Sequence, residues 1–200
     1  MPEAANKARE LRRVCVFCGS SPGARPIYLE AAAHLGALLV ALGIELVYGG
    51  ADVGLMGHLA RSVQEHGGHV IGVIPQGLVE KEVAHQGLPD LRIVKTMHER
   101  KALMEELSDG FIALPGGFGT IDELAEILTW AQLGYHDKAI GLWNVDGYFD
   151  LMLQFFDHMM QEKFLRPANL GLLLRSDEAG QLLDLMAAYR PPYREQLMEG

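Results

Sequence analysis

A glycine-rich segment, Pro115–Glu123 (PGGFGTIDE), carries the residues best suited to chemistry on an anion. It follows the apolar run Phe111–Leu114 and leads into a helical pattern, so we expect a strand, a tight turn and a helix start. That arrangement presents free backbone N–H groups and the positive end of the helix dipole to an anion. Glu123 adds a carboxylate one turn into the helix, which predicts chemistry on a phosphorylated molecule.

The same residues have a purely structural interpretation, because Thr120 and Glu123 have the T-x-x-E spacing of a helix capping box. Thr120 would then be the N-cap residue, and Glu123 would reach back to its N–H. A cap alone does not require the preceding Pro-Gly-Gly-x-Gly, however, and Asp122 and Glu126 would repel an anion bound nearby. A catalytic role for Glu123 explains this crowding of carboxylates and is compatible with capping.

A cation that could balance a bound phosphate is predicted at Arg100. It belongs to Thr96–Lys101 (TMHERK), which we expect at the exposed start of the helix after the strand Leu91–Val94. The guanidinium has the planar fork that matches phosphate or carboxylate. These charges could equally form a solvated first turn, but no Lys or Arg occurs from 108 to 137. Arg100 is therefore the nearest cation by topology, and its truncation should affect catalysis more than folding.

Two further glycine-rich turns are expected beside this site, at Gly19–Gly23 and Gly49–Gly57. Neither has the G-x-G-x-x-G spacing, and no turn carries the Gly-Lys-Ser or Gly-Lys-Thr of a P-loop. A dinucleotide dehydrogenase and a P-loop phosphotransferase are both disfavoured, whereas a mononucleotide site remains open.

The cysteines and histidines favour structural roles. Cys15 and Cys18 have C-x-x-C spacing but lie within a predicted strand, where residues three apart point to opposite faces. A redox role would need the pair at a helix start, and a zinc site would need a second cysteine pair. No metal site is predicted from the other candidates either, since no metal-ligand spacing connects His58, His85 and His98.

Strands and helices must alternate to bring these turns together. We expect strands at Val14–Cys18, Ile44–Tyr48, Val70–Ile74, Leu91–Val94, Phe111–Leu114 and Ala139–Trp143, with an edge strand at Leu170–Leu174. Helical patterns cover Ile27–Leu42, Gly54–Glu65, Arg100–Leu107, Ile121–Ala131, Tyr148–Gln161 and Glu178–Tyr189. This alternation predicts a Rossmann-like α/β three-layer sandwich, a mostly parallel sheet with helices on both faces. The glycine-rich turns would then share its carboxyl edge, where such sheets bind ligands.

Length and charge narrow the class of protein. The 200 residues suffice for a single nucleotide-binding domain, assigned to 13–190, between a frayed lead-in at 1–12 and a tail at 191–200. The net charge of −9 and the absence of a basic run argue against nucleic acid or an anionic membrane as a partner. No apolar stretch reaches the ~20 residues of a membrane span, and the start lacks a signal-peptide core. A cytoplasmic location is expected.

The motifs together resemble the LOG family, the cytokinin riboside 5'-monophosphate phosphoribohydrolases. Pro115–Glu123 matches that family's PGGxGTxxE signature, and Asp122 stands where relatives often carry Glu. Further matching segments follow in the family's order: Cys18–Ser21, Gly49–Gly57, Glu82–His85 and Met97–Lys101. The resemblance extends from about residue 14 to 174, which is most of the chain.

The resemblance implies hydrolysis of the N-glycosidic bond in an adenosine-type nucleoside 5'-monophosphate, giving free base and ribose 5-phosphate. It implies a catalytic pair, Arg100 and Glu123, and a homodimer or higher homo-oligomer with the site near the subunit boundary. It implies no cofactor. The residues expected to bind substrate or phosphate are Gly19, Ser20, Met56, Arg100, Lys101, Gly116, Gly117, Gly119 and Thr120.

Two alternatives to this activity remain. An AMP nucleosidase of broad purine specificity would differ only in its tolerance of substituents on the base. A carrier of a nucleotide or cofactor would need the glycine turns but not Arg100 with Glu123, and related folds bind molybdenum cofactor. Members of the family are also labelled lysine decarboxylases. That label is disfavoured, because decarboxylation needs pyridoxal phosphate bound to a lysine of the enzyme. The only lysine in the motifs, Lys101, lies beside Arg100 in a charged turn.

Overall fold

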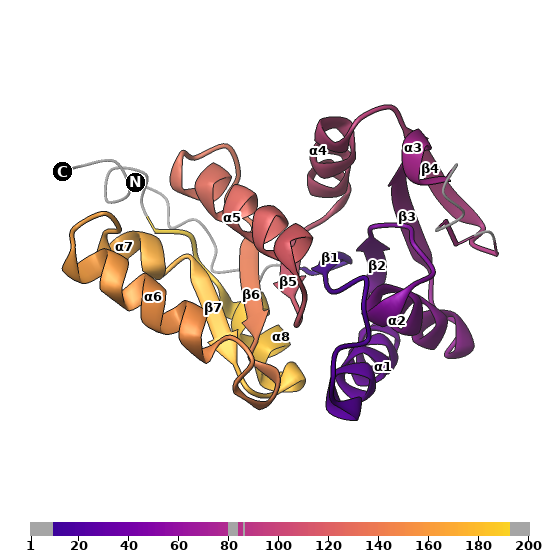
Figure 1. Ribbon diagram of the computed structural model, residues 1–200, viewed down its shortest axis with the longest axis horizontal. Helices are drawn as coiled ribbons and strands as arrows, with labels where there is room; N and C mark the ends of the chain where they lie inside the picture. The colour runs from indigo at the N-terminus through magenta and orange to yellow at the C-terminus, as the bar shows by residue number, and fades with distance from the viewer. Residues whose placement is uncertain (1–9, 80–83, 86, 193–200) are drawn as a thin grey trace, which may run out of the picture.

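The computed structural model describes residues 10–79, 84–85 and 87–192, which form a seven-stranded parallel sheet flanked by helices (Figure 1). The strand order is β4-β3-β2-β1-β5-β6-β7. The bounds are β1 Arg13–Phe17, β2 Glu45–Tyr48, β3 Val70–Pro75, β4 Asp90–Val94, β5 Gly110–Ala113, β6 Ala139–Trp143 and β7 Leu173–Ser176. The chain runs outward from β1 to one edge and resumes at β5 on the other side, which confirms the predicted Rossmann-like topology.

The helices form two layers, one on each face of the sheet. Their bounds are α1 Pro26–Ala41, α2 Gly54–Glu65, α3 Gln76–Val79, α4 Met97–Leu107, α5 Phe118–Gln132, the 3-10 turn η1 Val145–Gly147, α6 Asp150–Gln161, α7 Pro167–Leu170 and α8 Ala179–Ala188. Apolar side chains of α1, α2 and α8 share one core with the sheet, and those of α4, α5 and α6 share the other. The three-layer prediction is therefore confirmed.

Strand β1 shows how the sequence separates the two cores. Val14 and Val16 face the layer of α1, α2 and α8, whereas Cys15 and Phe17 face the opposite layer. Cys18, just after the strand, lies in the first core, so the two cysteines pack on opposite faces as predicted. Both are free thiols, and burial raises the pKa of each well above its ordinary value. Neither is poised as a thiolate.

Several element boundaries differ from the expected ones. Helix α4 begins at Met97 instead of Arg100, and α5 begins at Phe118 instead of Ile121, so each gains most of a turn. The last strand lies at Leu173–Ser176 because Pro167 starts the short helix α7 where the strand was predicted to begin. Among the described residues no helix is long and apolar enough to cross a membrane. The lead-in at 1–9 and the tail at 193–200 lie outside those residues, and the single-domain assignment stays a prediction.

Candidate active site

The loops after β1, β2 and β5 meet at the carboxyl edge of the sheet. Strands β1 and β5 are neighbours there, and the chain continues from them in opposite directions, which is the point where doubly wound sheets bind ligands. Gly19 N–H donates to the Pro115 carbonyl at 3.0 Å, and the Gly19 carbonyl accepts from Leu55 N–H at 3.0 Å. These bonds join all three glycine-rich turns directly.

A cavity of about 280 Å³ opens between these turns. It contains every predicted site residue except Gly116 and Lys101. Gly116 lines an adjoining cavity, which shares Gly19, Ser20 and Gly117 with the first. The residues around the first cavity are Cys18, Gly19, Ser20, Gly49, Ala51, Met56, Leu78, Arg100, Gly117, Phe118, Gly119, Thr120 and Glu123.

Arg100 and Glu123 form a buried ion pair in the wall of this cavity. Arg100 Nη1 donates to Glu123 Oε1 at 2.7 Å, and both side chains are only 9 % exposed. Arg100 Nε donates to the carbonyl of Val73, within β3, at 3.1 Å. The expected juxtaposition is present, but the expectation that Arg100 lies at an exposed helix start is wrong. The carbonyl of β3 and the carboxylate of α5 hold it below the surface.

Helix α4 places Arg100 through a cap that lies one turn before it. Thr96 is the N-cap residue, and its hydroxyl accepts from Glu99 N–H at 3.1 Å. The Glu99 carboxylate in turn accepts from Lys95 N–H at 2.8 Å. This reciprocal pair satisfies two backbone donors in the manner of a capping box, so the helix start is well defined. Arg100 follows in the first turn, with its side chain directed beneath the sheet edge.

The structural alternative for Thr120 and Glu123, a capping box, is not what the structure shows. Helix α5 has Gly117 as its N-cap, with no side-chain hydrogen bond there, and Thr120 is the third residue inside the helix. Glu123 therefore lies in the second turn, too far along to reach the first free N–H groups. Its carboxylate is committed to Arg100 instead.

Two opposing effects act on the Glu123 carboxyl. Burial raises its pKa, because the charged form loses solvation, and the charge and hydrogen bond of Arg100 act to lower it. Burial is the larger effect, so the pKa of Glu123 lies above the ordinary 4.5. A carboxylate in this state is a better proton acceptor than an ordinary surface glutamate.

The N-terminus of α5 offers the cavity its backbone N–H groups. The first N–H groups of a helix have no partner inside it, and in α5 these belong to Phe118, Gly119 and Thr120. A Cβ added at Gly117 or Gly119 would meet nothing within 4 Å. Packing inside the chain therefore leaves the backbone of this turn open for a close approach by a ligand.

Comparison with known proteins identifies the family. Residues 56–186 match a family model described as "Possible lysine decarboxylase". The rice "Probable cytokinin riboside 5'-monophosphate phosphoribohydrolase LOGL5" is 50 % identical over 185 residues, covering 92 % of this chain and 75 % of the relative. The Arabidopsis thaliana protein "Cytokinin riboside 5'-monophosphate phosphoribohydrolase LOG3" is 47 % identical over 182 residues, covering 91 % and 85 %. This chain belongs to the LOG family.

Solved structures share the fold of this LOG chain at much lower identity. The molybdenum cofactor binding protein of Rippkaea orientalis superimposes with a TM-score of 0.67 at 22 % identity, over 88 % of this chain and 95 % of the other. The molybdenum cofactor carrier protein of Chlamydomonas reinhardtii gives 0.66 at 18 % identity, over 96 % and 100 %. At this identity the likeness concerns the fold alone.

Lys101 of the LOG segment points away from the cavity that Arg100 enters. Its ammonium forms ion pairs with Asp122 and Glu126 of α5, each at 3.1 Å. Burial acts to lower the pKa of Lys101, but the hydrogen bonds to Glu126 and Asp122 outweigh it and raise the pKa overall. Asp122 and Glu126, the carboxylates expected to repel an anion bound nearby, are thus paired with Lys101. The expected contact of Lys101 with a phosphate has no support from this geometry.

Five lining residues were not among the expected ones: Cys18, Gly49, Ala51, Leu78 and Phe118. Gly49 was within a turn already noted, and its lack of a side chain is required, since a Cβ there would clash with the Arg100 guanidinium. Phe118 was within the LOG signature itself and is 97 % exposed. Leu78 lies on the short helix α3, for which the sequence pattern contained no signal.

The histidines of interest have separate surroundings. His85 is buried, with Nδ1 3.0 Å from the Tyr48 hydroxyl, while His58 is exposed near the Gly54 carbonyl. His98 is exposed at the start of α4. Within the part of the chain that the structure describes, no three His, Cys, Asp or Glu side chains are placed to hold a metal ion. Glu82 and Val83 of the LOG pattern lie outside that part.

Proposed function

We propose that this protein is a phosphoribohydrolase. It hydrolyses the N-glycosidic bond of adenosine-type nucleoside 5'-monophosphates, including N6-substituted cytokinin forms, to free base and ribose 5-phosphate. The observation that carries the proposal is the buried Arg100–Glu123 pair, which faces the open glycine turn at a helix N-terminus within one cavity. The printed names of the relatives at 47–50 % identity describe the same activity for those proteins.

The phosphate binds at the N-terminus of α5. The free N–H groups of Phe118, Gly119 and Thr120 and the helix dipole favour an anion there, and the open sides of Gly117 and Gly119 allow its oxygens to approach. Gly19 and Ser20 line the same cavity just after β1, and Gly19 contacts this turn through its hydrogen bond to the Pro115 carbonyl. The ribose then extends toward Glu123.

The base occupies the part of the cavity lined by the second glycine-rich turn. Met56, Ala51 and Leu78 give this part an apolar lining, which suits a purine face. The wall is otherwise backbone, at Gly49. A base held there leaves its glycosidic bond close to the Arg100–Glu123 pair.

Glu123 carries the chemistry. As the C1'–N9 bond breaks, its electron pair leaves with the base and positive charge develops on the ribose, which the carboxylate stabilises. Glu123 also accepts a proton from the attacking water, whose oxygen bonds to C1'. That proton then passes to the departing base anion, directly or through solvent, which completes the neutral free base and restores the carboxylate. General-base assistance of this kind contributes ~10²–10⁴-fold.

Arg100 maintains the charge balance of this site. Its charge and hydrogen bond lower the pKa of Glu123 and so favour the ionised carboxylate against the opposing effect of burial. The Val73 carbonyl fixes the guanidinium plane, so the carboxylate is oriented as well as charged. A carrier that only binds its ligand would have no need for such a pair.

The lysine decarboxylase label does not fit the site. A pyridoxal phosphate enzyme needs a lysine amine that can deprotonate and form an imine, whereas Lys101 is held by two carboxylates and its pKa is raised. The residues of the cavity thus fit a nucleotide and not that cofactor.

Product analysis tests the proposal. The purified protein is incubated with 5'-monophosphates of adenosine, N6-isopentenyladenosine and guanosine, and free base and ribose 5-phosphate are quantified by chromatography. We expect both products in equal amounts from the adenosine-type substrates. Preference for the N6-isopentenyl substrate favours the cytokinin reaction, whereas equal rates favour a broad nucleosidase. Binding without products would indicate a carrier.

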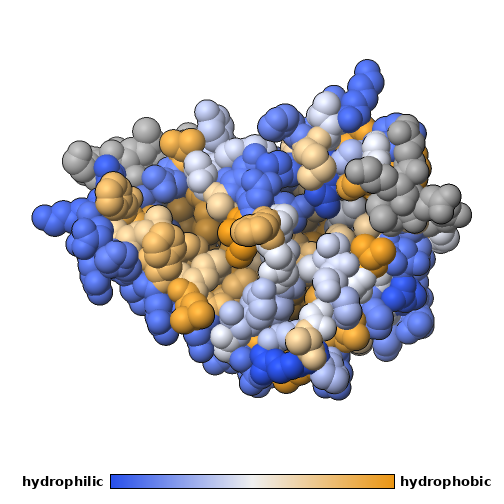
Figure 2. Space-filling model, in the orientation of Figure 1, coloured by the Kyte–Doolittle hydropathy of each residue, from blue (hydrophilic) through white to orange (hydrophobic). Residues whose placement is uncertain are grey.

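We also propose that the protein is a homodimer or higher homo-oligomer, assembled through the face made by α5, α6 and α7. Helix α6 has no buried residue, although Leu151 and Phe155 on it are apolar and 79 % and 58 % exposed. Figure 2 shows the apolar surface that gathers on this side of the molecule. A second copy would remove it from water, and patches of this kind mark protein contacts.

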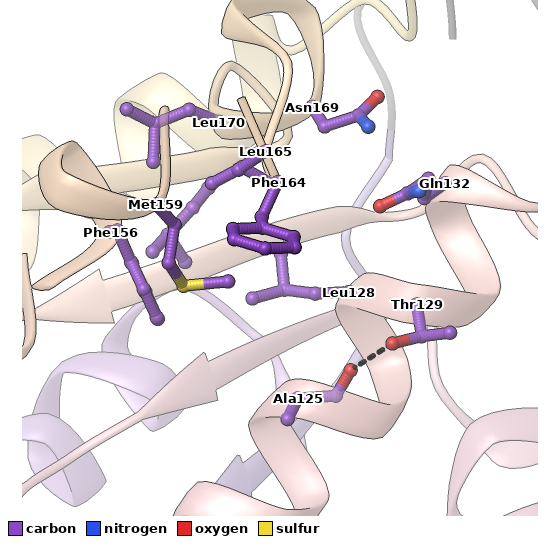
Figure 3. Close-up of a pocket in the computed structure, with 11 residues that line it drawn as sticks. Ala125, Leu128, Thr129, Gln132, Phe156, Met159, Phe164, Leu165, Asn169 and Leu170 are labelled. Carbon is purple, nitrogen blue, oxygen red and sulfur yellow. Dashed lines mark hydrogen bonds between the residues drawn. The ribbon is translucent and has the colours of Figure 1, made fainter. Parts of the chain in front are cut away.

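A groove of about 220 Å³ lies within this face, between α5 and α6. Figure 3 shows Phe164 directed toward Leu128 of α5, with Met159 and Phe156 of α6 beside it. Sedimentation velocity tests the assembly: wild type should sediment as a dimer or larger, and Leu151→Glu with Phe155→Glu should shift it toward monomer. A monomeric wild type at micromolar concentration would contradict the assembly.

A further inference from the structure

The peptide between Gly116 and Gly117 has a tether that comes from a distant part of the chain. Tyr148, which follows η1, donates its hydroxyl to the Gly116 carbonyl at 2.6 Å. The two residues are 32 positions apart, and Tyr148 belongs to neither the glycine-rich turns nor the ion pair. Nothing in the sequence pattern assigned it a role.

The orientation of this peptide matters for a bound anion. In a trans peptide the C=O of Gly116 and the N–H of Gly117 point in opposite directions. Gly116 lines only the adjoining cavity that contains Tyr148, whereas Gly117 lines both cavities. Holding the Gly116 carbonyl toward Tyr148 therefore directs its lone pairs away from the anion site and turns the Gly117 N–H the other way.

A peptide between two glycines rotates more readily than any other, because neither side has a Cβ to restrict it. If this peptide turned over, the Gly116 carbonyl would face the phosphate and repel it. The preceding carbonyl, that of Pro115, is held by Gly19 N–H at 3.0 Å. The hydroxyl of Tyr148 does the same for the next carbonyl.

Tyr148 is itself well positioned to act as a tether. Its ring packs edge-on against Tyr28 and Phe149, with ring centroids 5.6 and 4.9 Å away. The neighbouring residue Phe149 donates its N–H to Asn144 Oδ1 at 2.8 Å, and Asn144 is buried at the end of β6. The hydroxyl therefore starts from a rigid ring and an anchored backbone, and its hydrogen bond needs little further ordering.

We propose that Tyr148 is a positioning residue for the phosphate cradle. Its hydroxyl holds the Gly116–Gly117 peptide in the orientation that accepts an anion, and it acts through that peptide without touching the substrate. The proposal rests on the proposed function, because it takes the turn at the start of α5 as the phosphate site. It assigns a role in recognition of the 5'-phosphate to a residue far from the LOG signature.

Equilibrium binding of the two products separates this role from a structural one. Ribose 5-phosphate carries the anion and adenine does not, so titration calorimetry with each reports on a different part of the cavity. Tyr148→Phe removes only the hydroxyl and keeps the ring packing. Tyr28→Phe is the matched control, because Tyr28 is the neighbouring ring and its hydroxyl is bonded to Arg25 instead of the turn.

We expect Tyr148→Phe to lower the affinity for ribose 5-phosphate about tenfold, the scale of one hydrogen bond, and to leave the affinity for adenine unchanged. The KM for AMP should rise by a similar factor while kcat stays within about threefold. Tyr28→Phe should leave the affinities for both ligands unchanged. Unchanged ribose 5-phosphate affinity in Tyr148→Phe, or equal losses for both products, would overturn the positioning role alone. Failure of wild type to bind ribose 5-phosphate would instead overturn the phosphate site, and the positioning role with it.

Discussion

Two adjacent cations of α4 pair with different carboxylates of α5: Arg100 with Glu123, and Lys101 with Asp122 and Glu126. Arg100 pairs with Glu123, and both side chains are buried at the cavity. Lys101 pairs with Asp122, whose side chain is 60 % exposed, at the outer surface. Adjacent residues of a helix point about 100° apart around its axis, so neighbouring positions can lie in two different environments. The two cations are buried alike, with side chains 9 % and 12 % exposed, so burial of the carboxylate distinguishes the pair suited to chemistry from the pair that joins two helices.

Neutralising the two carboxylates Glu123 and Asp122 separately should give the largest difference in activity between the two pairs. Glu123→Gln should lower kcat for AMP by ~10²-fold or more, because the group that stabilises the ribosyl cation and accepts the proton is lost. Asp122→Asn is the matched control, and its kcat should stay within about threefold, the outcome for a surface pair. Steady-state kinetics on both variants measures the contrast. Near-normal kcat in Glu123→Gln would reduce that residue to a structural element.

The cations should differ in stability as well as in activity. Arg100→Ala leaves the Glu123 carboxylate buried and unpaired, which costs about 3 kcal/mol and lowers the melting temperature by ~6–12 °C. The value for kcat/KM should fall too, and Arg100→Lys should rescue it poorly, since a point charge cannot replace the planar fork. Lys101→Met should lower the melting temperature by less, because its partners are nearer to solvent.

Calorimetry and kinetics on the same samples test this contrast. Equal melting temperatures for the Arg100 and Lys101 variants would show that burial does not separate the two pairs. A large fall in melting temperature for Arg100→Ala with kcat/KM intact would make that arginine purely structural.

The pH dependence should have opposite signs for activity and stability. Burial raises the folded-state pKa of Glu123 above 4.5, so the acid limb of kcat/KM should lie above that value. A raised pKa favours folding of the protonated form, and this contribution is lost as pH rises through the folded pKa. As pH rises through the folded pKa of Glu123 and activity increases, the melting temperature of wild type should therefore fall relative to that of Glu123→Gln. An acid limb at or below 4.5 would contradict this.

The fold could be predicted because its signals are local or periodic. The alternating apolar runs predicted strands such as β1. Residue types also agree with the ends of α1, since Pro26 begins that helix and Gly43, with a φ of 69°, follows it. The last strand was misplaced because an apolar stretch near Pro167 fits a short helix as well as a strand. Periodicity cannot separate the two over so few residues.

The site was predicted in its members but not in its environment. The pairing of Arg100 with Glu123 followed from the resemblance to the LOG family, while the topology made Arg100 the cation nearest the glycine-rich turn. The burial of Arg100 did not, because it depends on the Val73 carbonyl and on the space left by Gly49, both distant in sequence. A cap at Thr120 was considered because Thr120 and Glu123 have T-x-x-E spacing. Thr96 and Glu99 have the same spacing and do cap α4, so the spacing alone does not show where a helix begins.

The requirement for the 5'-phosphate tests the proposed function directly, because efficient cleavage of a monophosphate depends on both the anion cradle and the buried Arg100–Glu123 pair. The measurement compares kcat/KM for AMP with that for adenosine, following base release by wild type at neutral pH. We expect AMP to be preferred by ~10³-fold or more, since charge-assisted contacts to the phosphate would each contribute roughly 1.5–3 kcal/mol. Equal efficiency with adenosine, or no base release from any monophosphate, would contradict the account.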